Sequence, residues 1–203
     1  MKDEILNKAG FMFLNFGFKS VTMDDIAKEL GISKKTIYKY FGNKEELVDE
    51  STEYVHVQIN NIITSITSKG YNPIKENFEI KKMFKELFKN SKTSPMYQLK
   101  KYYPKTYAKL IDREWCMFSD CVQSNLTRGI EEKLYRAELD IDVVSRFYFS
   151  IVFGIHEEDY HNHEKYDLAQ LEEAALEYHT RAIATEEGLK VLIEQLNNLN
   201  KDA

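Results

Sequence analysis

The stretch TMDDIAKELGISKKTIYKYF, residues 22–41, decides the fold of this chain. Thr22 and Asp25 have the spacing of a capping box, in which the side chain of each residue satisfies the backbone N–H of the other at the start of a helix. Gly31 allows a sharp bend, and Ser33 has a side chain suited to cap a second helix. Two short helices joined by a three-residue turn that contains glycine predict a helix-turn-helix.

Positive charge is concentrated in the second helix of this motif, which we expect from about Lys34 to Phe41. The stretch from Ser33 to Lys44 holds four lysines and no acidic residue, although residues 1–50 hold eight lysines against nine acids. In a helix-turn-helix, the second helix enters the major groove, where lysines neutralise phosphates and hydroxyl groups bind phosphates or base edges. We therefore predict DNA contacts from Ser33 before this helix and from the polar residues on it: Lys34, Lys35, Thr36, Tyr38 and Lys39.

The next helix begins with a second capping sequence, in which Asn43 stands three positions before Glu46. Lys44 lies in its first turn. Free N–H groups at a helix N-terminus bind anions, so we expect these groups and the Lys44 ammonium to hold one DNA phosphate together.

Apolar residues at helical spacing continue to the C-terminus, and no segment shows the two-residue alternation of an exposed strand. The sequence therefore predicts an all-α fold. We expect a DNA-binding domain at 1–48 and a helical effector-binding and dimerisation domain at 49–203. The predicted helices cover about 3–16, 24–30, 34–41, 44–67, 75–90, 95–102, 105–134, 141–158 and 167–184, with a last helix after Thr185.

The composition excludes several classes of protein. The 203 residues carry a net charge of −5, which argues against a DNA binder that relies on uniform positive charge. The N-terminus has no signal-peptide pattern, and no apolar run approaches the roughly 18 residues of a membrane span. We therefore expect a cytoplasmic protein. Cys116 and Cys121 stand five positions apart, on different faces of a predicted helix, and are expected to remain reduced.

The chain resembles the TetR family of transcription regulators over residues 5–50. The resemblance rests on the stretch from Phe16 to Ala27, on residues 30–41 and on residues 43–47. It implies a dimeric regulator, usually a repressor that a small molecule releases from DNA. It also implies phosphate contacts by Thr22, Tyr38, Tyr40 and Lys44, and base contacts or close approaches by Lys34, Lys35, Thr36 and Lys39. The operator sequence does not carry over, because the recognition helix varies within the family.

A helix-turn-helix monomer contacts few base pairs, so a two-fold dimer on a palindromic operator is expected. Wide apolar faces mark the predicted helices at 141–158 and 167–184, which we expect to form the homodimer interface as a four-helix bundle. Packing of the same faces within one subunit is the alternative.

The C-terminal segment is rich in aromatic residues that could enclose a small apolar or aromatic ligand. Core packing explains the same residues equally well. The candidates for the pocket are Phe78, Phe84, Phe88, Tyr107, Trp115, Phe118, Tyr148 and Phe153.

Other kinds of site receive little support. His156, His161 and His163 lie among acids, but their spacing fits a solvated acidic loop better than a metal site, so no metal or cofactor is expected. No nucleophile with its base, catalytic carboxylate pair or phosphate-binding glycine loop is present, so no enzyme is expected. The alternative function is an all-helical small-molecule-binding protein or enzyme without operator specificity.

Overall fold

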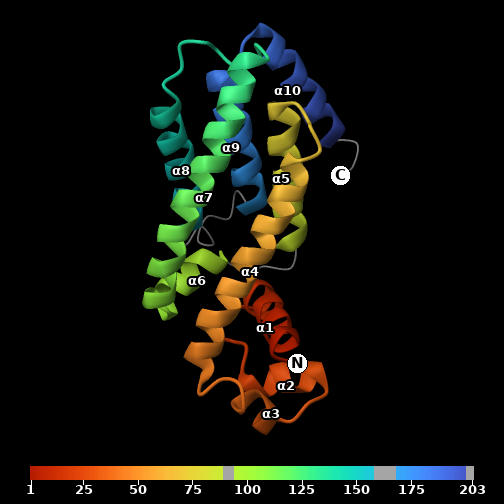
Figure 1. The fold of residues 1–203 in the computed structure, drawn as a ribbon, viewed down its shortest axis with the longest axis vertical. Helices are drawn as coiled ribbons and strands as arrows, with labels where there is room; N and C mark the ends of the chain where they lie inside the picture. Colours follow the sequence, from red (N-terminus) through yellow and green to blue (C-terminus); the bar gives the residue numbers. More distant parts are fainter. Residues whose placement is uncertain (89–93, 158–167, 200–203) are drawn as a thin grey trace. The chain divides into compact units, whose positions relative to one another are not determined.

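The computed structural model describes residues 1–88, 94–157 and 168–199 (Figure 1). These residues form α-helices and no strand, apart from an isolated β-bridge between Tyr135 and Ala184. The predicted all-α fold is confirmed. In chain order the helices are α1 (Lys2–Phe16), α2 (Met23–Leu30), α3 (Lys34–Tyr38), α4 (Lys44–Thr67), α5 (Pro73–Leu87), α6 (Pro95–Tyr102), α7 (Pro104–Glu131), α8 (Ile141–Glu157), α9 (Leu168–Ile183) and α10 (Glu186–Leu199).

The chain divides into two compact units that do not follow a single cut in the sequence. The first unit comprises Met1–Ile62, Phe88–Arg113 and His156–Asp159, and the second comprises Ile63–Leu87, Glu114–Ile155 and Tyr160–Ala203. The helix-turn-helix therefore shares its unit with α6, the first part of α7 and most of α4. The boundary between residues 48 and 49 stays a prediction.

The first unit is organised around a core that gathers the apolar faces of α1, α2, α3 and the start of α4. Phe13, Ile26 and Ile37 are at most 1% exposed. Phe13 and Phe18 stack with ring centroids 5.4 Å apart. Among the described residues beyond position 48, Leu99 of α6 is the one in the buried part of this core. The core therefore holds α3 through its buried side at Ile37, and it attaches α6 to the helix-turn-helix through Leu99.

Local capping explains where several helices begin. Ser94 accepts a hydrogen bond from the Tyr97 N–H, and Pro95 occupies the first position of α6, where its missing N–H costs nothing. The recognition helix α3 is shorter than expected, because it ends at Tyr38 rather than at Phe41. The backbone tightens there, since the N–H groups of Lys39 and Tyr40 bond to carbonyl groups three residues back.

The second unit contains a buried polar network in addition to its apolar core. The Glu76 side chain, 1% exposed, accepts hydrogen bonds from Arg128 Nη2 at 2.5 Å and from Asn125 Nδ2 at 2.8 Å. Asn125 Oδ1 accepts a hydrogen bond from the Tyr135 hydroxyl at 3.2 Å. Buried polar groups are costly unless they are paired, so this network specifies how α5 packs against α7.

Two other expectations concern membrane spans and the two cysteines. None of the described helices is both long enough and apolar enough to cross a membrane. Cys116 is exposed, Cys121 is half-buried, and both are free thiols, as expected.

One titratable ring lies in the core of the second unit. His179 of α9 is 5% exposed, and its ring stacks on Tyr148 of α8 with centroids 3.8 Å apart. Burial lowers the pKa of His179 from 6.5 to about 4. The neutral imidazole is therefore the form that the folded protein accommodates.

The His179 pKa predicts a pH-dependent free energy of unfolding. The unfolded chain binds a proton at this residue below about pH 6.5, whereas the folded protein does so only near pH 4, so stability falls as pH falls through this window. Between pH 7 and pH 4 the native protein should lose roughly 3 kcal/mol more than a His179→Phe variant, which keeps an aromatic ring. Urea denaturation at a series of pH values measures the difference. Parallel pH profiles of the two proteins would contradict the prediction.

Candidate DNA-binding site

The start of α2 is held by the reciprocal capping box that the sequence predicts. Thr22 Oγ1 accepts a hydrogen bond from the Asp25 N–H at 3.2 Å, and Asp25 Oδ2 accepts one from the Thr22 N–H at 2.9 Å. The Thr22 hydroxyl also donates to Asp25 Oδ2 at 2.7 Å, and these bonds lower the pKa of Asp25. Thr22 therefore orients α2, and its hydroxyl must leave Asp25 before it can donate to a phosphate.

The N-terminus of α3 is fixed in the same way. Ser33 Oγ accepts a hydrogen bond from the Thr36 N–H at 3.1 Å and lies 2.9 Å from the Thr36 hydroxyl. Lys34 forms an ion pair with Asp24 of α2, with Nζ 2.7 Å from Oδ2. Both partners are exposed, and exposed pairs contribute little stability, so Lys34 can exchange Asp24 for a phosphate at small cost.

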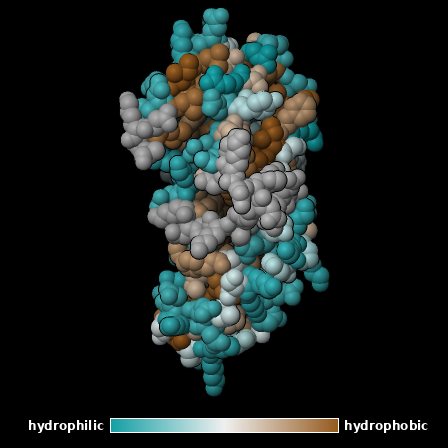
Figure 2. Space-filling model, turned by 180° about the vertical axis from the view of Figure 1, so that it is seen from behind, coloured by the Kyte–Doolittle hydropathy of each residue, from teal (hydrophilic) through white to brown (hydrophobic). Residues whose placement is uncertain are grey.

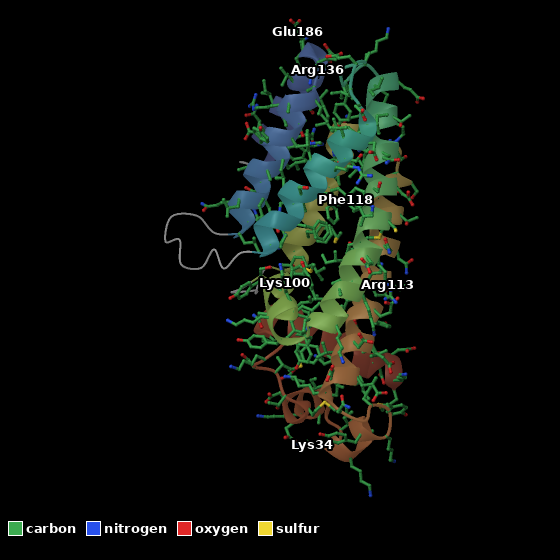
Figure 3. All side chains as sticks on the ribbon, turned by 90° about the vertical axis from the view of Figure 1, so that its left-hand side faces the viewer. Lys34, Lys100, Arg113, Phe118, Arg136 and Glu186 are labelled. Atoms are coloured by element: carbon green, nitrogen blue, oxygen red, sulfur yellow. The ribbon has the colours of Figure 1, made fainter. Side chains whose placement is uncertain are left out.

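The outer face of α3 and the turn after it present five side chains to solvent, Lys34 among them. Lys35 and Lys39 are exposed and make no ion pair with the described residues. Tyr38 and Tyr40 are 45% and 40% exposed, although large aromatic side chains are usually more deeply buried. Ile37 lies on the opposite side of the same helix and is completely buried. The helix therefore presents cations and phenol groups outward from a fixed apolar base, and Lys34 at its first turn is visible in Figure 3.

Lys44 is positioned differently from the other predicted contacts. Its ammonium donates to the carbonyl oxygens of Phe18 at 2.6 Å and Lys19 at 3.3 Å, and it lies 5.8 Å from the centre of the Phe13 ring. Partial burial lowers the pKa of Lys44. At the same helix start, Asn43 Oδ1 accepts a hydrogen bond from the Glu46 N–H at 2.9 Å. In this structure Lys44 ties α4 to the loop between α1 and α2.

The same loop binds α6, a contact that local sequence patterns do not reveal. Gln98 Oε1 accepts a hydrogen bond from the Phe18 N–H at 2.9 Å. Gly17 has a φ of 95°, and a side chain at this position would collide with Gln98. The only hint in the sequence is the placement of Gly17 after an amphipathic helix, which predicts a helix end but not its partner.

The residues predicted for a ligand pocket separate between the two units. Phe118 of α7 is the centre of an aromatic cluster in the second unit, with ring centroids 5.5 Å from Tyr148 and 5.9 Å from Phe153. Phe149, which was not among the pocket candidates, lies 5.3 Å from Phe118 and 4.9 Å from Trp115. Phe118 lies among the helices of this unit (Figure 3).

The remaining candidates lie outside this aromatic cluster. Phe78 is 6% exposed in the core of the second unit, and Phe84 is half-buried on α5. Phe88 and Tyr107 belong to the first unit, where Tyr107 packs against the core of the helix-turn-helix.

An open groove of 490 Å³ occurs in the first unit, between α1, α4 and α7. Its lining includes Asp49 and Glu53 of α4, which form ion pairs with Lys109 and Arg113 of α7. None of the predicted pocket residues lines it.

The predicted histidine run lies mainly outside the described residues. Only His156 is described, and its backbone carbonyl accepts a hydrogen bond from Ser94 Oγ at 2.8 Å. His161 and His163 lie outside the described residues. No group of three or more potential metal ligands occurs within the described part of the chain.

The contacts of Lys44 predict an effect on folding in the absence of DNA. A Lys44→Met variant keeps the apolar stem but loses two hydrogen bonds from a charged donor, so its free energy of unfolding should fall by about 1–3 kcal/mol. Lys35→Met is the matched control, because Lys35 is exposed, and its effect should stay within about 0.5 kcal/mol. Chemical denaturation without DNA measures both. Equal stability of the two variants would show that the bonds of Lys44 to the loop contribute nothing.

Residues 5–51 match the family model described as bacterial regulatory proteins, tetR family. The biofilm operon icaADBC HTH-type negative transcriptional regulator IcaR of Staphylococcus aureus is 33% identical over 88 residues, which are 43% of this chain and 44% of that protein. The chain thus aligns with less than half the length of this relative.

Solved structures are similar over nearly the whole chain. A TetR-family transcriptional regulator from Agrobacterium tumefaciens has a TM-score of 0.71 at 17% identity, with 91% of this chain and 97% of that chain covered. The transcriptional regulator FadR of Bacillus subtilis in complex with stearoyl-CoA has a TM-score of 0.63 at 21% identity, with 87% and 96% covered. At these identities the likeness shows a shared fold. The match to the tetR family model is confined to residues 5–51, and it identifies the helix-turn-helix segment as similar to that family.

Proposed function

We propose that this protein is a sequence-specific transcription regulator that binds a palindromic operator as a homodimer in the cytoplasm. A small-molecule effector would release it from DNA, which makes it a repressor. The relative IcaR is named a negative transcriptional regulator, which supports a repressor function for this protein. We assign DNA binding to residues 1–48 and effector binding with dimerisation to residues 49–203.

One observation carries the DNA-binding part of the proposal. The helix α3 exposes Lys35, Tyr38 and Lys39 on one side and buries Ile37 completely on the other. Its N-terminus is fixed by Ser33, and no carboxylate belongs to α3 or to the turn after it. A rigid, outward-facing row of cations and hydroxyls is suited to the phosphates and base edges of a major groove.

The exposed faces of α8 and α9 support the dimer that the operator requires. Phe147 of α8 is 65% exposed and Tyr178 of α9 is 68% exposed, whereas their neighbours Ser145 and Ala175 are buried. Val143, Ala174 and Ala182 add further exposed apolar surface to these helices. Figure 2 shows that hydrophobic side chains, drawn in brown, reach the surface among hydrophilic ones on the face in view. Large exposed aromatic residues on adjacent helices are typical of a protein interface, so we place the dimer contact here.

The effector is proposed to be a small apolar or aromatic molecule that binds in the second unit near Phe118. The aromatic rings of α7 and α8 around Phe118 support this class of ligand. The FadR structure contains stearoyl-CoA, which is an acyl ligand of that protein. An effector that favours a misplaced pair of recognition helices would weaken operator binding, and by linkage the operator would weaken effector binding by the same factor.

Selection from a pool of random duplex DNA, at two salt concentrations, tests operator binding. We expect an inverted repeat whose half-sites lie about 34 Å apart, one turn of the double helix. Lys34, Lys35 and Lys39 of both subunits would neutralise six phosphates, which gives a slope of roughly −5 for log affinity against log salt. A Lys35→Ala/Lys39→Ala variant should lose the selected motif and show a slope of roughly −2.

A Lys82→Ala/Lys190→Ala variant is the control, because it removes two exposed lysines of the second unit. It should select the native motif with an unchanged salt slope. If the native protein enriches no motif and all three proteins bind DNA alike, the proposal fails. An all-helical small-molecule-binding protein or enzyme without operator specificity would then remain.

The interface proposal predicts that charge at the exposed aromatic positions separates the subunits. In a Phe147→Glu/Tyr178→Glu variant, four carboxylates would be buried without partners, and the dimer dissociation constant should rise at least about a hundredfold. Sedimentation equilibrium measures it. Ile193→Glu on α10 is the control, since Ile193 is 49% exposed but lies outside the proposed interface. A double variant that remains as dimeric as the control would place the interface elsewhere.

A further inference from the structure

The start of α2 carries two neighbouring carboxylates that have different roles. Asp25 is committed to the capping box, because its Oδ2 accepts hydrogen bonds from the Thr22 N–H at 2.9 Å and from the Thr22 hydroxyl at 2.7 Å. Asp24 takes no part in this cap, and its side chain is 66% exposed. One carboxylate therefore holds the start of the helix, and the other points outward from it.

The outward carboxylate reaches the recognition helix. Asp24 Oδ2 lies 2.7 Å from Lys34 Nζ, although the two residues are ten positions apart in the sequence. Met23 and Ile26, which flank Asp24 on α2, are at most 4% exposed, so the backbone that carries the carboxylate is fixed in the core. The cap at Ser33 fixes the backbone of Lys34 at the start of α3. The packing of α2 beside α3 thus brings the two charges together.

Lys34 differs in this respect from the other lysines of α3 and the turn after it. Lys35 and Lys39 are exposed and form no ion pair with the described residues. An ammonium group beside a carboxylate has almost no net charge at a distance, so the pair attracts a phosphate only at short range. Lys35 and Lys39 therefore attract any duplex that comes near, whereas Lys34 binds only a phosphate that displaces Asp24.

The exchange of Asp24 for a phosphate depends on how the DNA is held. An exposed ion pair of this kind changes an equilibrium by roughly threefold. A phosphate that contacts Lys34 in isolation recovers about the same factor, so a loosely bound duplex gains nothing from the exchange. Base contacts made by α3 would hold a phosphate beside Lys34 already, and the exchange then costs no further loss of freedom. The contact of Lys34 is therefore conditional on close docking.

We propose that Asp24 is a specificity-determining residue, which withholds Lys34 from DNA of unrelated sequence and releases it when α3 docks on the operator. Specific interfaces commonly contain an element that disfavours the wrong partner, and a carboxylate in contact with a phosphate-binding lysine is such an element. Asp24 acts through Lys34 and binds no DNA itself. This inference rests on the proposed function, because it requires α3 to bind DNA.

The test compares Asp24→Asn with the matched control Glu29→Gln. Glu29 is an exposed carboxylate of the same helix, and its Oε2 lies 3.8 Å from Lys8 Nζ of α1, so the control removes the same charge from a pair that does not involve α3. Lys34→Met and the double variant Asp24→Asn/Lys34→Met complete a double-mutant cycle. Urea denaturation first establishes that each variant is folded and measures its free energy of unfolding.

Two duplexes of equal length are the probes. One carries the motif selected from the random pool, and the other carries the same bases in scrambled order. Fluorescence anisotropy measures the affinity of each protein for both duplexes over a range of salt concentrations.

The Asp24→Asn variant should bind the scrambled duplex about tenfold more tightly than the native protein, since a dimer releases two lysines at roughly threefold each. Its slope of log affinity against log salt on this duplex should grow in magnitude by about 2, because two more phosphates are neutralised. Its affinity for the motif should change by less than about threefold, so that the preference for the motif falls. Glu29→Gln should match the native protein on both duplexes.

The double-mutant cycle tests whether Asp24 acts through Lys34. In the Lys34→Met background, Asp24→Asn should change the affinity for the scrambled duplex by less than about twofold, because the carboxylate no longer has an ammonium group to withhold. If Asp24→Asn strengthens binding equally with and without Lys34, the carboxylate merely repels phosphates and the inference is wrong. An equal gain on the motif and the scrambled duplex would overturn it as well.

Further outcomes separate failure of this inference from failure of the proposed function. If Asp24→Asn binds both duplexes like Glu29→Gln and only its free energy of unfolding falls, Asp24 serves the N-terminus of α2, and the inference is wrong. The proposed function would stand in that case, because the native protein still prefers the motif. If the native protein enriches no motif from the random pool, the proposed function fails and this inference fails with it.

Discussion

The burial of Ile37 is the interaction on which the rest of the first unit depends. The helix α3 has five residues, far too few for an isolated helix to be stable in water. It exists because Ile37 is completely buried, because Ser33 caps its first turn, and because Gly31 turns the chain back with a φ of 65°. Every exposed cation of α3 is thus presented by a helix that the core, rather than its own hydrogen bonds, keeps folded.

This dependence explains why other parts of the first unit converge on the loop between α1 and α2. Lys44 binds the carbonyl groups of the loop, and Gln98 binds the Phe18 N–H. Phe18 itself stacks on Phe13. The loop is therefore a junction of α1, α4 and α6, and a displacement of α4 or α6 would be transmitted to the start of α2. Such a junction is a physical route by which events in the chain beyond residue 50 can reach α3.

Features set by short-range chemistry could be predicted from the sequence. Capping residues marked the starts of α2 and α4, and hydrophobic periodicity marked the inward face of α3 at Ile37. The end of α3 was predicted wrongly because Phe41 keeps its apolar spacing although the backbone has already tightened at Lys39. Hydrophobic periodicity predicts which side chains are buried. It does not predict the backbone hydrogen-bond pattern that ends the helix.

Features set by long-range packing could not be predicted. Nothing near Lys44 in the sequence shows that its ammonium binds the carbonyl groups of the loop between α1 and α2. In the same way, Tyr107 and Phe118 lie on one predicted helix, but the first packs on the core of the first unit and the second on the core of the second unit. Residue type predicted that these aromatic rings would be inside, whereas only the tertiary fold decides which core each one joins.

The charge distribution shows how a protein with a net charge of −5 can be suited to bind a polyanion. Acidic residues in the first unit are largely committed to internal roles: Asp25 caps α2, Asp24 pairs with Lys34, and Asp49 pairs with Lys109. Screening by salt confines the influence of exposed charges to about 10 Å, so acids elsewhere in the chain have little effect at the surface of α3. Local arrangement rather than net charge therefore governs association with DNA.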